Sequence, residues 1–174
     1  MPDKNCLLVV SALGKDRPGI VDQLSKAVLE SGGNIVDSRM TVLGGDFAIL
    51  LLVEGRWDAL SKLENGIPSL QKKLDLSIAL KRTEPRSPAT ENMPYMVEVV
   101  AMDHTGIVHG LASFFSARNI NIEDLATSCY QAPHTGTTMF ALHMAVGIPA
   151  AMHISTLREE FMEYCDSLNL DAVL

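Results

Sequence analysis

An internal repeat limits the folds open to this chain more than any other property of its sequence. The segment Asp-Arg-Pro-Gly-Ile-Val that begins at Asp16 returns as Asp-His-Thr-Gly-Ile-Val at Asp103. A second pair of segments, Asn-Ile-Val-Asp at Asn34 and Asn-Ile-Glu-Asp at Asn121, has the same offset of 87 residues. Two short motifs in one constant register indicate that the 174 residues contain one small module written twice.

A proline-rich segment separates the two copies. Residues 84–94 hold three prolines, which is typical of a linker. We therefore predict a first domain over residues 1–84, a linker over residues 85–94 and a second domain over residues 95–174. The chain is long enough for two small domains that each bury a core.

The expected elements follow the same order in both copies. Apolar runs at residues 6–13 and 95–102 predict strands, and each is followed by apolar residues at helical spacing. Gly32 and Asn119 are expected to end these first helices. Two strands come next, joined by a tight glycine turn in the first copy and by a longer loop in the second.

A second amphipathic helix and a last strand complete each copy. Gly66 and Pro68 should kink or break this helix in the first copy. The order βαββαβ, found twice, predicts an α+β fold of two ferredoxin-like modules, each an antiparallel four-stranded sheet with its helices on one face. Several strands, such as residues 6–13, are apolar on both faces, so we expect the helix-free face to be covered by the other repeat or by another chain. We therefore predict a homo-oligomer that associates through its sheets.

Charge is distributed unevenly. Residues 1–84 hold 11 of the 14 Lys and Arg and 11 of the 21 Asp and Glu, so the net charge of −7 belongs to the second half. This half lacks the clustered cations that phosphate binding needs, which argues against direct contact with nucleic acid. Its acidic surface either keeps the protein in solution or docks a basic partner.

Other composition features point to an ordinary protein of the cytoplasm. No apolar run approaches membrane-helix length, and the first residues do not resemble a signal peptide. Three widely spaced cysteines suit reduced thiols and match no zinc motif. The histidines form no metal-ligand pair on one helix face, so we expect no metal, no cofactor and no membrane association.

The turn from the first strand to the first helix is the candidate binding site in each copy. A helix N-terminus favours a carboxylate by about 0.3–1 kcal/mol, and Gly19 and Gly106 let a ligand approach the backbone. Asp16 and Asp103 offer carboxylates to an ammonium group, a combination that suits a free amino acid. The same residue types also serve as ordinary helix caps and turns, and this alternative stays open.

These motifs resemble the ACT domain, a βαββαβ module that commonly senses amino acids. A tandem of this size is similar to the glycine cleavage system transcriptional repressor family, whose members are understood to contact an activator protein without reading DNA. The resemblance implies a small amino acid as ligand, glycine or serine, and a regulatory protein such as a transcription activator as partner. It implies ligand-binding roles for Asp16, Pro18, Gly19, Asn34, Asp103, Gly106 and Asn121. The second copy departs from the pattern with His104 and Thr105, so the two sites are expected to differ.

The sequence lacks the residues that other functions of this fold require. An RNA-recognition module needs aromatic residues flanked by cations, and a copper chaperone needs a Cys-x-x-Cys motif. An acylphosphatase-like site would use Arg17 with Asn34 but also needs a glycine-rich cradle for phosphate. No serine or cysteine has a recognisable base, so we expect no catalytic residue and no enzyme. The alternative that remains is a non-catalytic subunit conferring feedback control on a metabolic enzyme.

Overall fold

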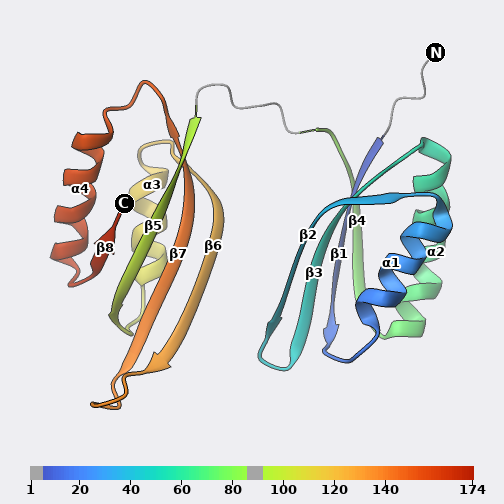
Figure 1. Ribbon diagram of the computed structural model, residues 1–174, viewed down its shortest axis with the longest axis horizontal. Coiled ribbons are helices and arrows are strands. Elements are labelled where there is room, and N and C mark those ends of the chain that lie inside the picture. The colour runs from blue at the N-terminus through green and yellow to red at the C-terminus, as the bar shows by residue number, and fades with distance from the viewer. Residues whose placement is uncertain (1–5, 86–91) are drawn as a thin grey trace. The chain divides into compact units, whose positions relative to one another are not determined.

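The chain folds as two compact units. The computed structural model describes residues 6–85 and 92–174, so residues 86–91 of the expected linker lie outside the described residues. Residues 6–85 belong to the first unit and residues 92–174 to the second. Each unit has its own sheet and helices (Figure 1) and its own hydrophobic core.

The first unit is a four-stranded antiparallel sheet with two helices on one face (Figure 1). Its strand order is β2-β3-β1-β4, which makes β1 and β3 the central strands. Its elements are β1 (Cys6–Lys15), α1 (Ile20–Ser31), β2 (Asn34–Leu43), β3 (Asp46–Gly55), α2 (Trp57–Leu74) and β4 (Ser77–Thr83).

The second unit has the same architecture, with the strand order β6-β7-β5-β8. Its last strand is short, and it pairs only with the middle of β5. The predicted fold class, two ferredoxin-like βαββαβ modules, is confirmed. The elements are β5 (Asn92–Met102), α3 (Ile107–Ser116), β6 (Asn121–Gln131), β7 (Thr138–Pro149), α4 (Ile154–Ser167) and β8 (Asp171–Val173).

Two local features differ from the expectations. Helix α2 runs unbroken through Pro68, because it buries Leu60, Leu63 and Ile67 against the sheet, and this packing outweighs the roughly 3 kcal/mol that an interior proline costs. Of the predicted kink or break, the break is therefore wrong. Strand β5 begins before residue 95, because β7 is long enough to pair with it as far as Asn92.

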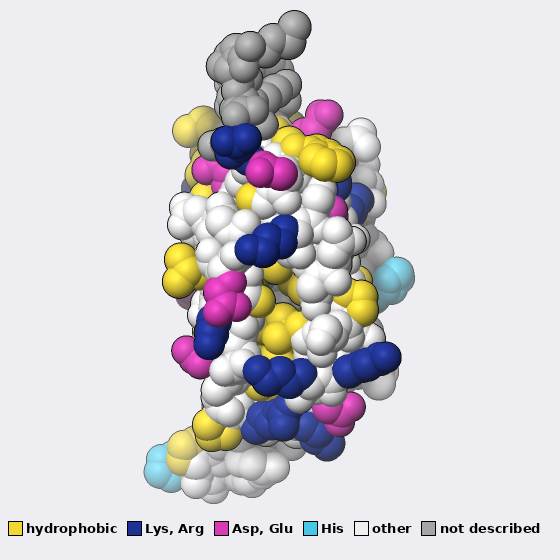
Figure 2. Space-filling view, turned by 90° about the vertical axis from the view of Figure 1, so that its right-hand side faces the viewer, with side chains coloured by type: hydrophobic (Ala, Val, Ile, Leu, Met, Phe, Trp, Pro, Cys, Tyr) yellow, Lys and Arg dark blue, Asp and Glu magenta, His cyan; other side chains and the backbone are white. Residues whose placement is uncertain are grey.

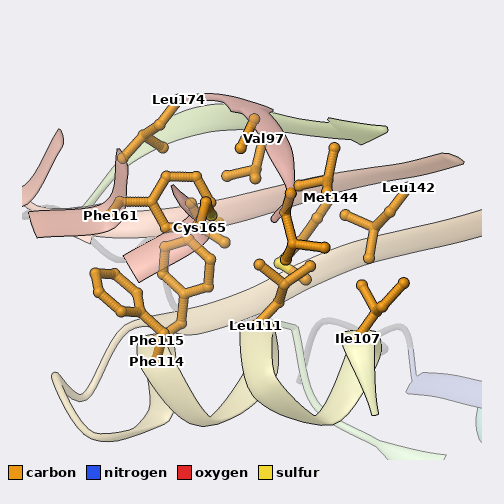
Figure 3. Packing of buried hydrophobic residues seen from close by; sticks show 14 of the residues in the cluster. Val97, Ile107, Leu111, Phe114, Phe115, Leu142, Met144, Phe161, Cys165 and Leu174 are labelled. Carbon is orange, nitrogen blue, oxygen red and sulfur yellow. The ribbon is translucent and has the colours of Figure 1, made fainter. Parts of the chain in front are cut away.

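Each unit buries one apolar cluster between its helices and the inner face of its sheet. In the second unit the rings of Phe114, Phe115 and Phe161 pack against one another within this cluster (Figure 3). The ring centroid of Phe161 lies 5.3 Å from that of Phe114 and 5.3 Å from that of Phe115. Aromatic contacts of this kind stabilise a core beyond the burial of their area.

The helix-free faces of both sheets expose apolar side chains, as the alternation predicted. Leu13 and Leu50 on the first sheet are 54% and 52% exposed, and Met96 and Met102 on the second are 59% and 66% exposed. On the helix side of the first unit, Figure 2 shows Lys and Arg side chains interspersed with Asp and Glu and with some exposed apolar side chains. What covers the two helix-free faces stays a prediction.

The edge strands β2 and β6 each contain a bulge at the same place in the repeat. The register against the neighbouring strand shifts between Ile35 and Asp37 in β2 and between Ile122 and Asp124 in β6. At each bulge the edge strand therefore holds one residue more than its neighbour, which bends the strand and strengthens its twist locally.

Candidate ligand site at the strand-to-helix turns

The turn between β1 and α1 is tied to the β2–β3 hairpin beside it. The amide of Asp16 donates to the carbonyl of Gly45, 3.3 Å away. Helix α1 begins after Gly19, whose φ of 91° is left-handed, and no side chain caps the helix. Asp16 is exposed at this end of the sheet, and the first amides of α1 have no side-chain acceptor, a combination that can hold an ammonium and a carboxylate group.

The turn between β5 and α3 repeats these contacts. The amide of Asp103 donates to the carbonyl of Thr138, 3.0 Å away, and Gly106 has a φ of 97°. No side chain caps α3 either. Capping by a side chain, the alternative reading of these residues, is thus not their role in either helix.

Arg17 has a structural role in the first turn. Its guanidinium donates to the carbonyl of Leu74 at the end of α2. Lys73 of α2 also donates to Gln23 of α1, with 2.8 Å between Nζ and Oε1. In the second copy the equivalent residue His104 contacts only the neighbouring carbonyl of Thr105, 3.1 Å away. The two turns therefore have similar backbone contacts and differ in the side-chain hydrogen bonds that hold them.

Asn34 and Asn121 lie at the other end of their sheets. Lys15, next to Asp16, pairs with Asp46 at one end of β3, whereas Asn34 pairs with Glu54 at the other. This places Asp16 and Asn34 about 26 Å apart along the strands. The second unit has the same arrangement, because Met102 pairs with Met139 and Asn121 with Gly147. The structure brings Asp16, Pro18 and Gly19 together and Asp103 with Gly106, but neither asparagine joins them within its unit.

Each asparagine instead lines a groove between the first helix and the edge strand of its unit. The groove of the first unit has a volume of about 560 Å³ and contains Asp22 and Lys26, which the sequence reasoning missed. Their spacing of four residues on α1 was the available signal, since it puts both side chains on one face of the helix. The groove of the second unit, about 440 Å³, has Ala112 and Ser116 on its helix wall.

The pKa shifts found in the described part of the chain belong to contacts away from the turns. A hydrogen bond from Arg82 lowers the pKa of Glu64, and the same contact raises the pKa of Arg82. Burial raises the pKa of Cys165 to about 11, so this thiol stays protonated in the core. These are structural groups, and none of them takes part in the candidate site.

Two features are absent from residues 6–85 and 92–174. No group of three His, Cys, Asp or Glu side chains is placed to hold a metal ion. No helix in this part of the chain combines the length and the apolar character needed to cross a bilayer.

The glycines that precede the helices provide a test of the turn geometry. Gly19→Ala and Gly106→Ala should each lower the free energy of unfolding by about 1 kcal/mol, because a Cβ meets no atom within 4 Å but the left-handed φ is strained. Gly66→Ala, in the interior of α2, should raise it by about 1 kcal/mol. Urea denaturation measures both signs, and stabilisation by Gly19→Ala would contradict the left-handed geometry.

Comparison with known proteins places the chain in a family. The family model described as ACT domain matches residues 6–81. The chain is 32% identical over 164 residues to the glycine cleavage system transcriptional repressor of Escherichia coli, covering 93% of this chain and 85% of that protein.

Two solved structures match over nearly their whole length. One, provisionally assigned to a glycine cleavage system transcriptional repressor, has a TM-score of 0.73 at 28% identity and covers 97% of this chain and 95% of its own. The other, from Galdieria sulphuraria, has a TM-score of 0.78 at 27% identity and covers 98% and 97%. The chain therefore belongs to the ACT domain family, as a tandem protein of the kind represented by the glycine cleavage system transcriptional repressor.

Proposed function

We propose that this protein is a non-catalytic regulator that senses a small amino acid and controls transcription by contacting another protein. The observation that carries this proposal is the similarity to the Escherichia coli repressor along 93% of the chain, through both units. The charge distribution supports an indirect action, since the second unit lacks the clustered cations that would bind phosphates. We place its action in the cytoplasm, where such a partner works.

The proposed ligand is glycine or serine, held at the strand-to-helix turns. Asp16 would accept hydrogen bonds from the ammonium group, and the free amides after Gly19 would donate to the carboxylate. Asp103 and Gly106 offer the same groups in the second unit. His104 and Thr105 replace Arg17 and Pro18 there, so we expect the two turns to differ in affinity.

A second copy of the unit would complete the site. Asp16 and Asn34 lie at opposite ends of α1, a helix of 12 residues and therefore about 18 Å long. If α1 of a partner chain packs antiparallel to α1 of this chain, the end of the partner's helix that carries Asn34 meets the turn that carries Asp16. The asparagine of the partner chain then supplies both a donor and an acceptor to the ligand. This arrangement accounts for a site whose parts are separate within one unit.

The helix-free face of the first unit suits the predicted homo-oligomer. Its charges balance, and two of its cations are already paired, Arg39 with Asp37 at 2.6 Å and Lys15 with Asp46 at 3.9 Å. Two such faces can meet without net repulsion and bury their apolar centres. A regulatory subunit of a metabolic enzyme, the second candidate function, would use the same ligand site.

Affinity capture of the tagged protein from its native cells, with and without glycine, distinguishes these functions. Recovery of a transcription activator in an amount that glycine changes supports the proposal. Recovery of a biosynthetic enzyme instead supports the feedback subunit and rejects control of transcription. The Asp16→Ala variant is the control, because its capture of the same partner should no longer respond to glycine.

A further inference from the structure

The helix-free face of the second sheet combines an apolar centre with carboxylates. Residues that alternate with the buried ones along β5 project from it, among them Met96, Val100 and Met102, which are 59%, 38% and 66% exposed. Val173 of β8 and Tyr130 of β6 belong to the same face, because they pair with or align beside these outward residues. We name this surface, with the carboxylates described next, the methionine face.

The charges of the methionine face all have one sign. Glu98 lies on the central strand β5, Asp171 on one edge strand and Asp124 on the other. No Lys or Arg projects from the described residues of this face. The Nδ1 atom of His143 lies 3.5 Å from the Oε1 atom of Glu98. The matching face of the first unit carries three cations and three carboxylates: Lys15, Arg39, Lys81, Asp37, Asp46 and Glu54. The acidic character is therefore specific to the second unit.

This combination excludes several occupants on charge alone. Nucleic acid and anionic lipid headgroups are repelled by the three carboxylates. A second methionine face would place carboxylates against carboxylates, which disfavours self-association through this surface. An apolar centre of flexible methionine side chains adapts to varied apolar partners, and carboxylates attract Lys and Arg.

We propose that the methionine face binds a basic amphipathic helix of a partner protein. The edge strands that carry Asp124 and Asp171 are separated by three strand spacings, about 14 Å, and a helix with its side chains is about 10–12 Å wide. The apolar side of such a helix packs on Met96, Val100 and Met102, while its Lys and Arg reach the carboxylates. This inference rests on the proposed function, which already includes a protein partner. It adds the surface that the partner binds and the chemistry that the partner needs.

Fluorescence anisotropy with a labelled amphipathic helical peptide of Leu and Lys tests the charge requirement on the full chain. The double variant Glu98→Lys/Asp171→Lys should bind the peptide about tenfold more weakly than the wild type. The matched control is Glu159→Lys/Glu163→Lys, which makes the same change in net charge on exposed residues of α4 and should bind as the wild type does. Equal weakening in both variants, or in neither, overturns the proposal.

Methionine oxidation by hydrogen peroxide tests where the peptide binds. Met96 and Met102 should oxidise in the free protein and be protected by the peptide, whereas Met40 in the first unit, 56% exposed, should oxidise in both conditions. Resistance of Met96 and Met102 in the free protein means that another part of an assembly of this chain covers the face, and the proposal then fails. Both experiments are done without an amino acid, so their failure leaves the ligand-sensing proposal to its own test.

Discussion

Replacing Phe161 by alanine is expected to lower the free energy of unfolding of the second unit by about 3–5 kcal/mol. Phe161 is fully buried, and its ring contacts those of Phe114 and Phe115 in the core (Figure 3). Removing the ring loses its transfer free energy and leaves a cavity that the surrounding rings and the sheet cannot close. The effect is large compared with the stability of a unit of this size.

The two units carry separate spectroscopic reporters, which makes this experiment specific. The only tryptophan, Trp57, is in the first unit, and all three tyrosines are in the second. Urea denaturation of Phe161→Ala should shift the tyrosine transition and leave the tryptophan transition in place. Glu163→Ala, an exposed residue on the same helix, is the control and should change stability by no more than about 0.5 kcal/mol. A tryptophan transition that shifts as far as the tyrosine transition would contradict two independent cores.

Glycine or serine is expected to stabilise the protein against thermal unfolding. A ligand that binds only the folded state at one hundred times its dissociation constant adds about 2.7 kcal/mol. For a domain of this size, such a gain corresponds to a rise in Tm of roughly ten degrees or more. Differential scanning fluorimetry with the twenty amino acids measures the shift, and the absence of a shift with all of them rejects ligand sensing.

Variants at the two turns assign this shift to a site. Asp16→Ala should abolish the shift if the first turn binds the ligand, because the ammonium group loses its carboxylate. Asp103→Ala tests the second turn in the same way. Asp58→Ala removes an exposed carboxylate from the first turn of α2, at the end of the unit opposite Asp16, and should keep the full shift. Loss of the shift in Asp58→Ala would show that it depends on net charge instead of on the turns.

Much of the fold could be predicted because its signals are local. Alternating apolar residues specify a strand, and the glycine at position 32 ends α1 with a φ of 89°. The interruption expected at Pro68 did not occur, since the cost of an interior proline is local while the burial that offsets it comes from the sheet. The extent of β5 likewise depends on its partner β7. The length of the partner strand cannot be predicted from the residues of β5 alone.

The candidate site was harder to predict, because a motif identifies residues and not the distances between them. Asp16 and Asn34 recur together in both copies, yet a 12-residue helix separates them, so each belongs to a different end of the sheet. That separation follows from the length of the helix and could have been predicted from the sequence. The hydrogen bond from Arg17 to the carbonyl of Leu74 was not, since it joins elements that only the tertiary fold brings together.

The paired bulges in β2 and β6 have a consequence for the behaviour of the protein at high concentration. An unbroken outer strand is a template on which foreign chains add by backbone pairing, and stacking of this kind leads to fibres. The shift of register near the start of β2 and of β6 interrupts that template on one edge of each sheet. A duplicated module doubles the number of sheet edges, and the bulge, duplicated along with it, shortens the regular stretch of β2 and β6 on which another chain could pair.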